Sequence, residues 1–143
     1  MTNAAGWTLR DDLQLMAEIA VSASVRGLGS RATPVVQAIA HFAPDHAAPA
    51  ICRALTALGA GDTSQAVAML ETATRTAHRG TDATRGLMLL ALVMAERMTE
   101  ARELHQTLMG GSSGAVRRLA ESLEPLLAPG MQNDEQRERE IIA

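Results

Sequence analysis

Four histidines are the residues of this chain that could bind a metal or transfer protons. His41 and His46 are five residues apart with Pro44-Asp45 between them, which is not a spacing that places two ligands on one helical turn. His78 and His105 have no histidine or cysteine near them in the sequence. We interpret all four as surface or capping residues, and the pattern predicts no metal site.

The other reactive side chains lack the neighbours that catalysis needs. Cys52 stands among Ile51 and Leu55 on a predicted helix, where a free cysteine usually packs as a small hydrophobe, and no nucleophile motif surrounds it. Asp11 and Asp12 are adjacent at a helix start, so they do not face each other and interact with the helix dipole instead. The sequence therefore predicts no catalytic residue, and we do not expect an enzyme.

Glycines and arginines cluster in two places that we interpret as structural. Gly27-x-Gly29 is too short for a phosphate-binding loop and follows no predicted strand, so it indicates a turn. Arg75, Arg79 and Arg85 gather near one predicted loop and are typical of a solvated edge that could meet an acidic partner. No cofactor is predicted from either cluster.

The composition indicates one helical domain. The chain has 143 residues, of which 47% are hydrophobic, enough for a single core. Trp7 and Phe42 are the only aromatic residues, while Ala, Leu and Met are abundant, which favours helices over strands. We predict an all-α domain over residues 1–130, followed by a charged tail or frayed helix over 131–143.

Charge and cysteine usage restrict the partners and the compartment. All 13 basic residues are arginine and the net charge is −3, so no broad positive field is present and nucleic acid is not expected as a partner. The single cysteine cannot form an internal disulfide, and the first 12 residues show no secretion signal. The longest apolar run, Leu87 to Ala95, is too short to span a membrane. These features predict a cytoplasmic protein.

Apolar periodicity, together with Gly and Pro stop signals, predicts seven helices. Asp45 and Asp82 are the expected N-caps of the third and fifth helices, and Pro34 is expected in the first turn of the second. The predicted helices are Thr8 to Gly27, Thr33 to Pro44, Asp45 to Leu58, Thr63 to Thr76, Asp82 to Ala95, Thr99 to Met109, and Ser112 or Ser113 to Pro125–Pro129.

An internal repeat of 34 residues organises these helices. The segment from Gly27 to Ala32 recurs from Gly61 to Ala66, and a third copy, displaced by 35 residues, is visible around Ala101. Each unit reads as a helix, a glycine-containing turn and a second helix, which is the period and form of a tetratricopeptide (TPR) array.

The second unit resembles the TPR pattern over most of its length. Small residues stand at Ala54, Ala66 and Ala73 and a bulky one at Leu70, an alternation that allows close helix packing. The other units depart from the pattern, because His105 occupies a large apolar position of the third and no unit keeps the aromatic residues of the full motif. We predict a TPR-like stack of antiparallel helix pairs with about three repeats and a C-terminal helix.

Residues 13–109 are also similar to the TPR-like chaperones of bacterial type III secretion that hold the needle subunit before export. The similarity rests on three degenerate repeats, Leu/Ala-rich helices and a Gly-x-x-x-Gln-Ala-x-x-x-Leu turn. It implies a cytoplasmic, non-enzymatic chaperone that shields an amphipathic helix of a secreted subunit, working with a small helical co-chaperone.

Residues at corresponding positions of the three repeats lie on the same face of the stack. This repeat equivalence predicts the partner-binding surface. Equivalent first-helix positions on the concave side of a TPR-like stack are almost all apolar, which suits an amphipathic helix laid into a groove. The alternative is that the seventh helix, residues 114–127, closes over some of them as ordinary core. The predicted partner-binding residues are Val21, Val25, Ile51, Leu55, Leu58, Leu90, Val93 and Met94.

Other function classes remain alternatives. A generic TPR-like scaffold would use the same groove, and a second copy of the chain would cover it when no partner is present. A helical transcriptional regulator needs a basic recognition helix, which the sequence lacks. A small helical enzyme would need polar groups that converge in a pocket.

Overall fold

The computed structural model describes residues 9–128 and residue 141, and the side chains from residue 11 onward in the first range. This part of the chain forms seven helices and no strand, which confirms the predicted all-α class. The predicted tail, 131–143, lies outside the described residues except for Ile141. The helices are α1 (Leu9–Val25), α2 (Gly29–Phe42), α3 (Ala48–Gly59), α4 (Thr63–Thr76), α5 (Thr81–Met94), α6 (Met98–Gly111) and α7 (Gly114–Leu127).

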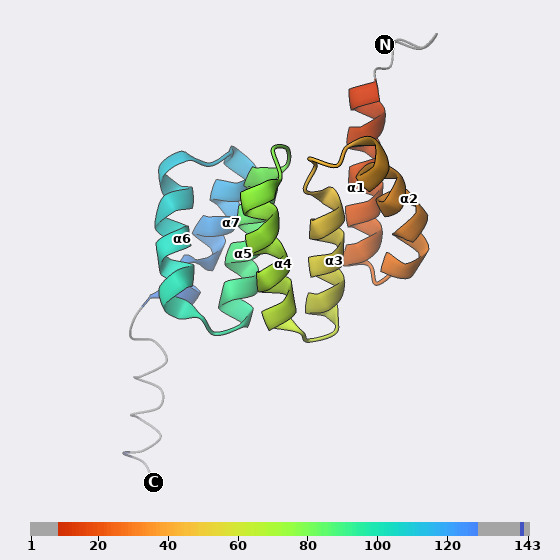
Figure 1. The fold of residues 1–143 in the computed structure, drawn as a ribbon. Coiled ribbons are helices and arrows are strands. Elements are labelled where there is room, and N and C mark those ends of the chain that lie inside the picture. Colours follow the sequence, from red (N-terminus) through yellow and green to blue (C-terminus); the bar gives the residue numbers. More distant parts are fainter. Residues whose placement is uncertain (1–8, 129–140, 142–143) are drawn as a thin grey trace.

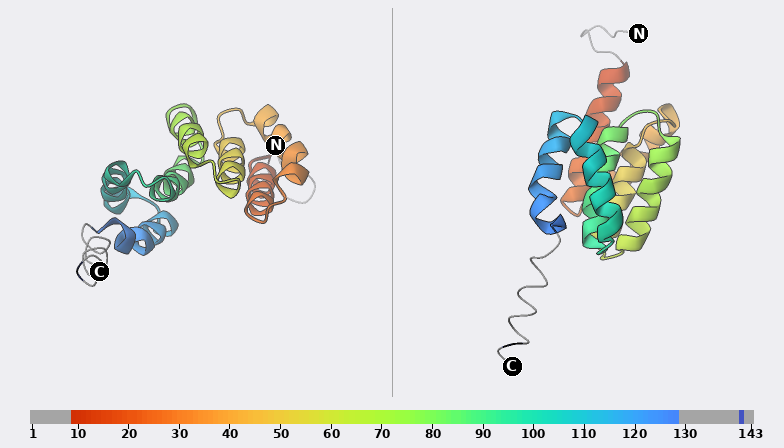
Figure 2. Two further views of the ribbon diagram at one scale, coloured as in Figure 1. Left: turned by 90° about the horizontal axis from the view of Figure 1, so that it is seen from below. Right: turned by 90° about the vertical axis from the view of Figure 1, so that its left-hand side faces the viewer.

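Successive helices run antiparallel and stack side by side as pairs (Figure 1). The pairs are α1 with α2, α3 with α4, and α5 with α6, and α7 then packs against both α5 and α6. Seen along the helices, the stack curves so that α1 and α7 lie toward one side and α2 and α4 toward the other (Figure 2). We call the side of α1, α3, α5 and α7 the concave face, and the side of α2, α4 and α6 the convex face.

The predicted repeat is visible in the helix bounds. α3 ends at Gly59, 34 residues after α1 ends at Val25, and α5 ends a further 35 residues along at Met94. The second helices of the three pairs follow the same spacing and begin at Gly29, Thr63 and Met98. The stack of three helix pairs followed by a C-terminal helix is confirmed.

Small residues at equivalent positions allow the helices to pack closely. In the first helices Ala20 and Ala54 are fully buried, and in the second helices Ala66 and Ala101 are fully buried. A helix with alanine at its contact point admits the bulky side chains of its neighbour, such as the fully buried Leu70. One apolar cluster extends from α3 to α7 and a separate, smaller one from α1 to α3, so α3 contributes buried residues to both.

The predicted start of the second helix was wrong. α2 begins at Gly29, and Pro34 lies inside it instead of in its first turn. The carbonyl of Leu28 accepts hydrogen bonds from the amides of Arg31 and Ala32, so a complete turn forms before the proline. Because proline lacks an N–H, the helix loses only its backbone bond to the carbonyl of Ser30, whose side chain is exposed.

The sequence predicted Asp45 and Asp82 as the N-caps of the third and fifth helices. This prediction was wrong. The amide of Ala48, at the start of α3, donates instead to the Nδ1 atom of His46, at 3.0 Å. Asp82 lies within α5, and its carboxylate accepts a hydrogen bond from the amide of Ser113 at the start of α7. Both carboxylates therefore bind a segment more than 30 residues away.

Ala66 offers a direct test of the close packing. Ala66→Leu adds three carbons where no space exists, so we expect it to lower the free energy of unfolding by about 1–3 kcal/mol. The measurement is urea unfolding followed by circular dichroism. Ala68→Leu, on the exposed side of the same helix, is the matched control and is expected to change the value by less than about 0.5 kcal/mol. Equal effects of the two variants would contradict the packing argument.

Candidate functional site

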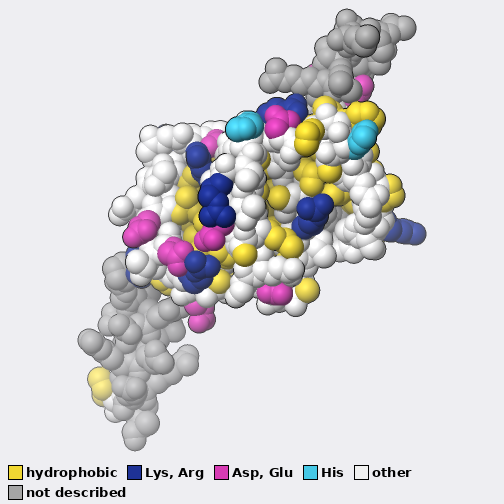
Figure 3. Space-filling view, in the orientation of Figure 1, with side chains coloured by type: hydrophobic (Ala, Val, Ile, Leu, Met, Phe, Trp, Pro, Cys, Tyr) yellow, Lys and Arg dark blue, Asp and Glu magenta, His cyan; other side chains and the backbone are white. Residues whose placement is uncertain are grey.

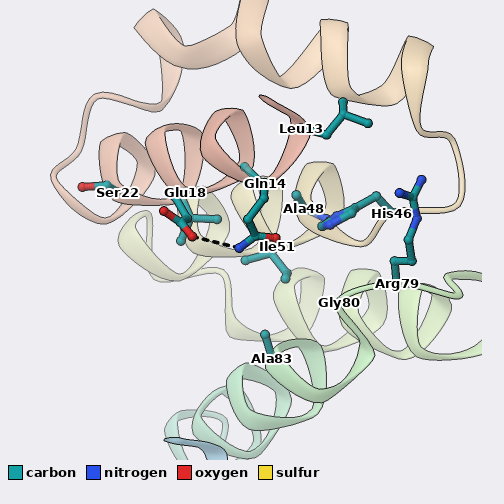
Figure 4. A pocket seen from close by; sticks show the side chains of 12 residues that line it. Leu13, Gln14, Glu18, Ser22, His46, Ala48, Ile51, Arg79, Gly80 and Ala83 are labelled. Atoms are coloured by element: carbon teal, nitrogen blue, oxygen red, sulfur yellow. Dashed lines mark hydrogen bonds between the residues drawn. The ribbon is translucent and has the colours of Figure 1, made fainter. Parts of the chain in front are cut away.

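A groove opens on the concave face between α1, α3 and α5. It arises because α5 packs mainly on α4, α6 and α7, and its contact with α3 is the smallest among the helix pairs that touch. The groove has a volume of about 570 Å³ and is lined by α1, α3, the start of α5 and the two loops that precede α3 and α5. Figure 4 shows Ile51 of α3 between the groove side of α1 and Ala83 of α5.

The surface of this groove is mainly apolar. Leu13, Ala17 and Ile51 form a buried floor, and Val21 on α1 is half-buried above it. The polar side chains of α1 lie along the rim, where the amide of Gln14 donates to the carboxylate of Glu18 at 2.9 Å (Figure 4). The groove therefore offers an apolar floor beneath a hydrogen-bonded polar edge.

An ion pair joins the two loops that border the groove. Arg79 donates from Nε and Nη2 to the two carboxylate oxygens of Asp45, at 3.0 and 2.7 Å. The guanidinium holds the pKa of Asp45 below its usual value, and the carboxylate in turn raises the pKa of Arg79. These residues are 34 positions apart, so they occupy equivalent places in consecutive repeats. We call this contact the loop tie.

Backbone hydrogen bonds reinforce the loop tie. The carbonyl of Asp45 accepts from the amides of His78 and Arg79, and the carbonyl of Arg79 accepts from the amide of Ala47. His46 lies in the same loop and accepts the amide of Ala48 through Nδ1, which requires that this nitrogen carries no proton. Burial, followed by the charge of Arg79, lowers the pKa of His46.

The structure brings two of the predicted partner-binding residues together in the groove, Val21 and Ile51. Three others, Leu58, Leu90 and Val93, are half-buried and pack against the larger apolar cluster. The remaining three residues, Leu55, Val25 and Met94, do not line the groove either. Leu55 is half-buried, and Val25 and Met94 are 67% and 48% exposed.

Helix α7 occupies part of the face that repeat equivalence had assigned to a partner. A side chain at Gly86 on α5 would lie 3.3 Å from Val116 and 3.4 Å from Leu119, so the two helices meet there without intervening space. The alternative considered from the sequence, that the seventh helix closes over α5, thus holds at this position. The groove lined by Val21 and Ile51 lies in the half of the concave face near α1.

Two other reactive residues noted from the sequence, Cys52 and His105, pack within the fold. Burial raises the pKa of the Cys52 thiol, which keeps it in the less reactive protonated form. His105 contacts the carbonyl of Ala120 at 3.1 Å and so joins α6 to α7.

Within residues 9–128 no three His, Cys, Asp or Glu side chains are placed to share a metal ion. No helix of the described part is both long and apolar enough to cross a bilayer.

Comparisons with known proteins identify no relative. No family model, no curated protein and no solved structure matches this chain.

The lowered pKa of His46 predicts that the stability of the fold depends on pH. Its pKa is lower in the folded state than the usual value of 6.5, so the unfolded chain takes up a proton first as the pH falls. The contribution of neutral His46 to the free energy of unfolding is present above pH 6.5. It is lost as the pH falls from there toward the pKa of His46 in the folded state. We expect urea unfolding to show this loss as the pH falls below 6.5.

Two variants isolate the contribution of His46. His46→Asn keeps an acceptor for the amide of Ala48 without a titrating group, so its stability is expected to vary less over this range. His41→Asn, which removes an exposed histidine at the end of α2, is the control and is expected to retain the full pH dependence. A pH profile that is unchanged in His46→Asn would contradict the assignment.

Proposed function

We propose that the protein is a non-enzymatic binding module that holds an apolar helix face of a partner protein in the concave groove. The observation that carries the proposal is the apolar floor of Leu13, Ala17 and Ile51 between helices that do not close over it. Such a floor gains free energy when a partner's apolar side chains replace water above it.

The polar groups around the groove favour an apolar ligand over a small polar one. Gln14 is bonded to Glu18, and Arg79 is bonded to Asp45. The Nδ1 atom of His46 is engaged by a backbone amide. A small polar ligand needs free groups that converge on it, and these groups are already paired with one another. The apolar floor is therefore the part of the groove that binds the apolar side of an amphipathic helix. The polar rim contacts the polar side of the same helix.

The narrower proposal is a cytoplasmic chaperone of the kind that holds the needle subunit in type III secretion. Its support is the sequence resemblance over residues 13–109 together with an apolar groove in a three-pair stack. In this role the cargo is an amphipathic helix of a self-assembling subunit, and a small co-chaperone or a second copy covers exposed apolar surface when cargo is absent.

Val21→Asp tests the proposed groove. It places an unpaired charge beside the apolar floor, which we expect to weaken binding of a neutral amphipathic helical peptide of Leu, Ala and Gln about tenfold or more. The measurement is fluorescence anisotropy with the labelled peptide. Val25→Asp is the matched control, because it makes the same change one turn along α1 at an exposed position outside the groove.

Three outcomes are distinguishable once circular dichroism shows that both variants are folded. Loss of binding in Val21→Asp alone supports the groove. An equal loss in both variants would move the contact to another face of α1. Unchanged binding in both variants, or no binding by the wild-type protein, would contradict the proposed function.

A further inference from the structure

A second groove lies on the convex face, between α2 and α4. No Cα atom of α2 comes within 8 Å of one in α4, although both helices pack against α3. Two hollows of about 580 and 590 Å³ occupy the intervening space and share Arg53 and Met69 in their linings. One reaches the loop at Ala47 and the other reaches Ala60 beyond the opposite end of α3, so together they follow this helix along its whole length. We call the combined feature the convex groove.

The lining of the convex groove combines small side chains with one exposed cation. Along the walls and floor lie Ala40, Ala50, Ala68 and Ala73, which leave room for bulky side chains of a partner. Figure 3 shows this face, with hydrophobic side chains in the hollow over α3 and a basic side chain among them. Arg53 is the only Arg or Lys in the linings of both hollows.

Arg53 has no negative partner within the described part of the chain. The ion pairs found there involve Arg79 and Arg97, and neither hollow has an Asp or Glu in its lining. The hydroxyls of Thr56 and Thr72 donate to carbonyls one turn earlier in their own helices. Arg53 is therefore the only permanently charged side chain in these linings, where it lies among neutral polar residues such as Gln37 and Gln65.

We propose that the convex groove binds an amphipathic helix of a partner protein that carries a carboxylate among bulky apolar side chains. The bulky side chains fill the space that the alanines leave, and the carboxylate pairs with the guanidinium of Arg53. α3 has 12 residues, about 18 Å of helix, which matches about three turns of a bound helix. The groove is on the opposite face from the concave groove, so the two helices can be held at once.

The test uses three labelled peptides of about 16 residues, long enough to form a helix, with Leu on one face and a central Glu, Gln or Lys. For the wild-type full-length protein, fluorescence anisotropy is expected to give about fivefold tighter binding of the Glu peptide than of the Gln peptide. This preference is expected to disappear in Arg53→Gln. In Arg53→Glu it is expected to reverse in favour of the Lys peptide.

Matched variants locate the effect and separate it from the concave groove. Arg31→Gln removes an exposed arginine of α2 that lines neither hollow, and it is expected to keep the Glu preference. Val21→Asp alters the concave groove alone and is also expected to keep it. A Glu preference that survives Val21→Asp but not Arg53→Gln supports the convex groove even if the concave groove binds nothing.

The remaining outcomes overturn the proposal. These are equal binding of the Glu and Gln peptides, no binding of either peptide, an unchanged preference in Arg53→Gln, or an equal loss in Arg31→Gln. Sedimentation velocity supplies the last check. A wild-type dimer that becomes monomeric in Arg53→Gln would show that a second copy occupies this groove, which also overturns the assignment to a separate partner.

Discussion

The loop tie between Asp45 and Arg79 is the contact on which the shape of the concave groove depends. α3 and α5 scarcely touch, so their separation is set by α4, which packs against both, and by the tie that joins the loops before them. The carboxylate and the backbone carbonyl of Asp45 both accept hydrogen bonds from the segment His78–Arg79. An ion pair as exposed as this one adds little to stability in general, so its effect is mainly geometric. It connects consecutive repeats at equivalent positions and leaves the space beside Ile51 open.

The small residues of the repeat determine where the remaining space lies. The buried alanines of the repeat bring neighbouring helices into close contact, which places the bulky side chains in the interior. These alanines are Ala20, Ala54, Ala66 and Ala101. α2 and α4 do not touch, and α3 and α5 have the smallest contact of the helix pairs that do touch. Each of these two places borders one of the proposed binding surfaces.

Local patterns in the sequence were enough to predict the fold. Apolar periodicity and glycine turns predicted seven helices, and the 34-residue repeat predicted their pairing, because both depend on contacts between residues close in sequence or in equivalent units. The capping predictions for Asp45 and Asp82 failed for the complementary reason. A carboxylate before or at the start of a helix is indistinguishable in sequence from one that binds a segment 31 or 34 residues away.

The candidate site was less predictable. Of the residues predicted from repeat equivalence, Val21 and Ile51 line the concave groove, whereas Leu90 and Val93 pack against the larger apolar cluster. How far a last helix folds back over the concave face depends on the curvature of the stack, and no local pattern encodes that curvature. The sequence did not single out Arg53, because a single arginine on a helix is ordinary. The role proposed for it rests on α2 and α4 standing apart on either side of it.

Nuclear magnetic resonance of protein labelled at the isoleucine δ1 methyl groups tests the central claim most directly. Ile51 forms part of the concave floor, whereas Ile39 lies in the core of the first helix pair and Ile19 is exposed outside the concave groove. With the neutral helical peptide bound, we predict intermolecular nuclear Overhauser effects to the methyl group of Ile51 and none to that of Ile39. Contacts to Ile19 without any to Ile51 would contradict the assignment of the concave groove as the binding site.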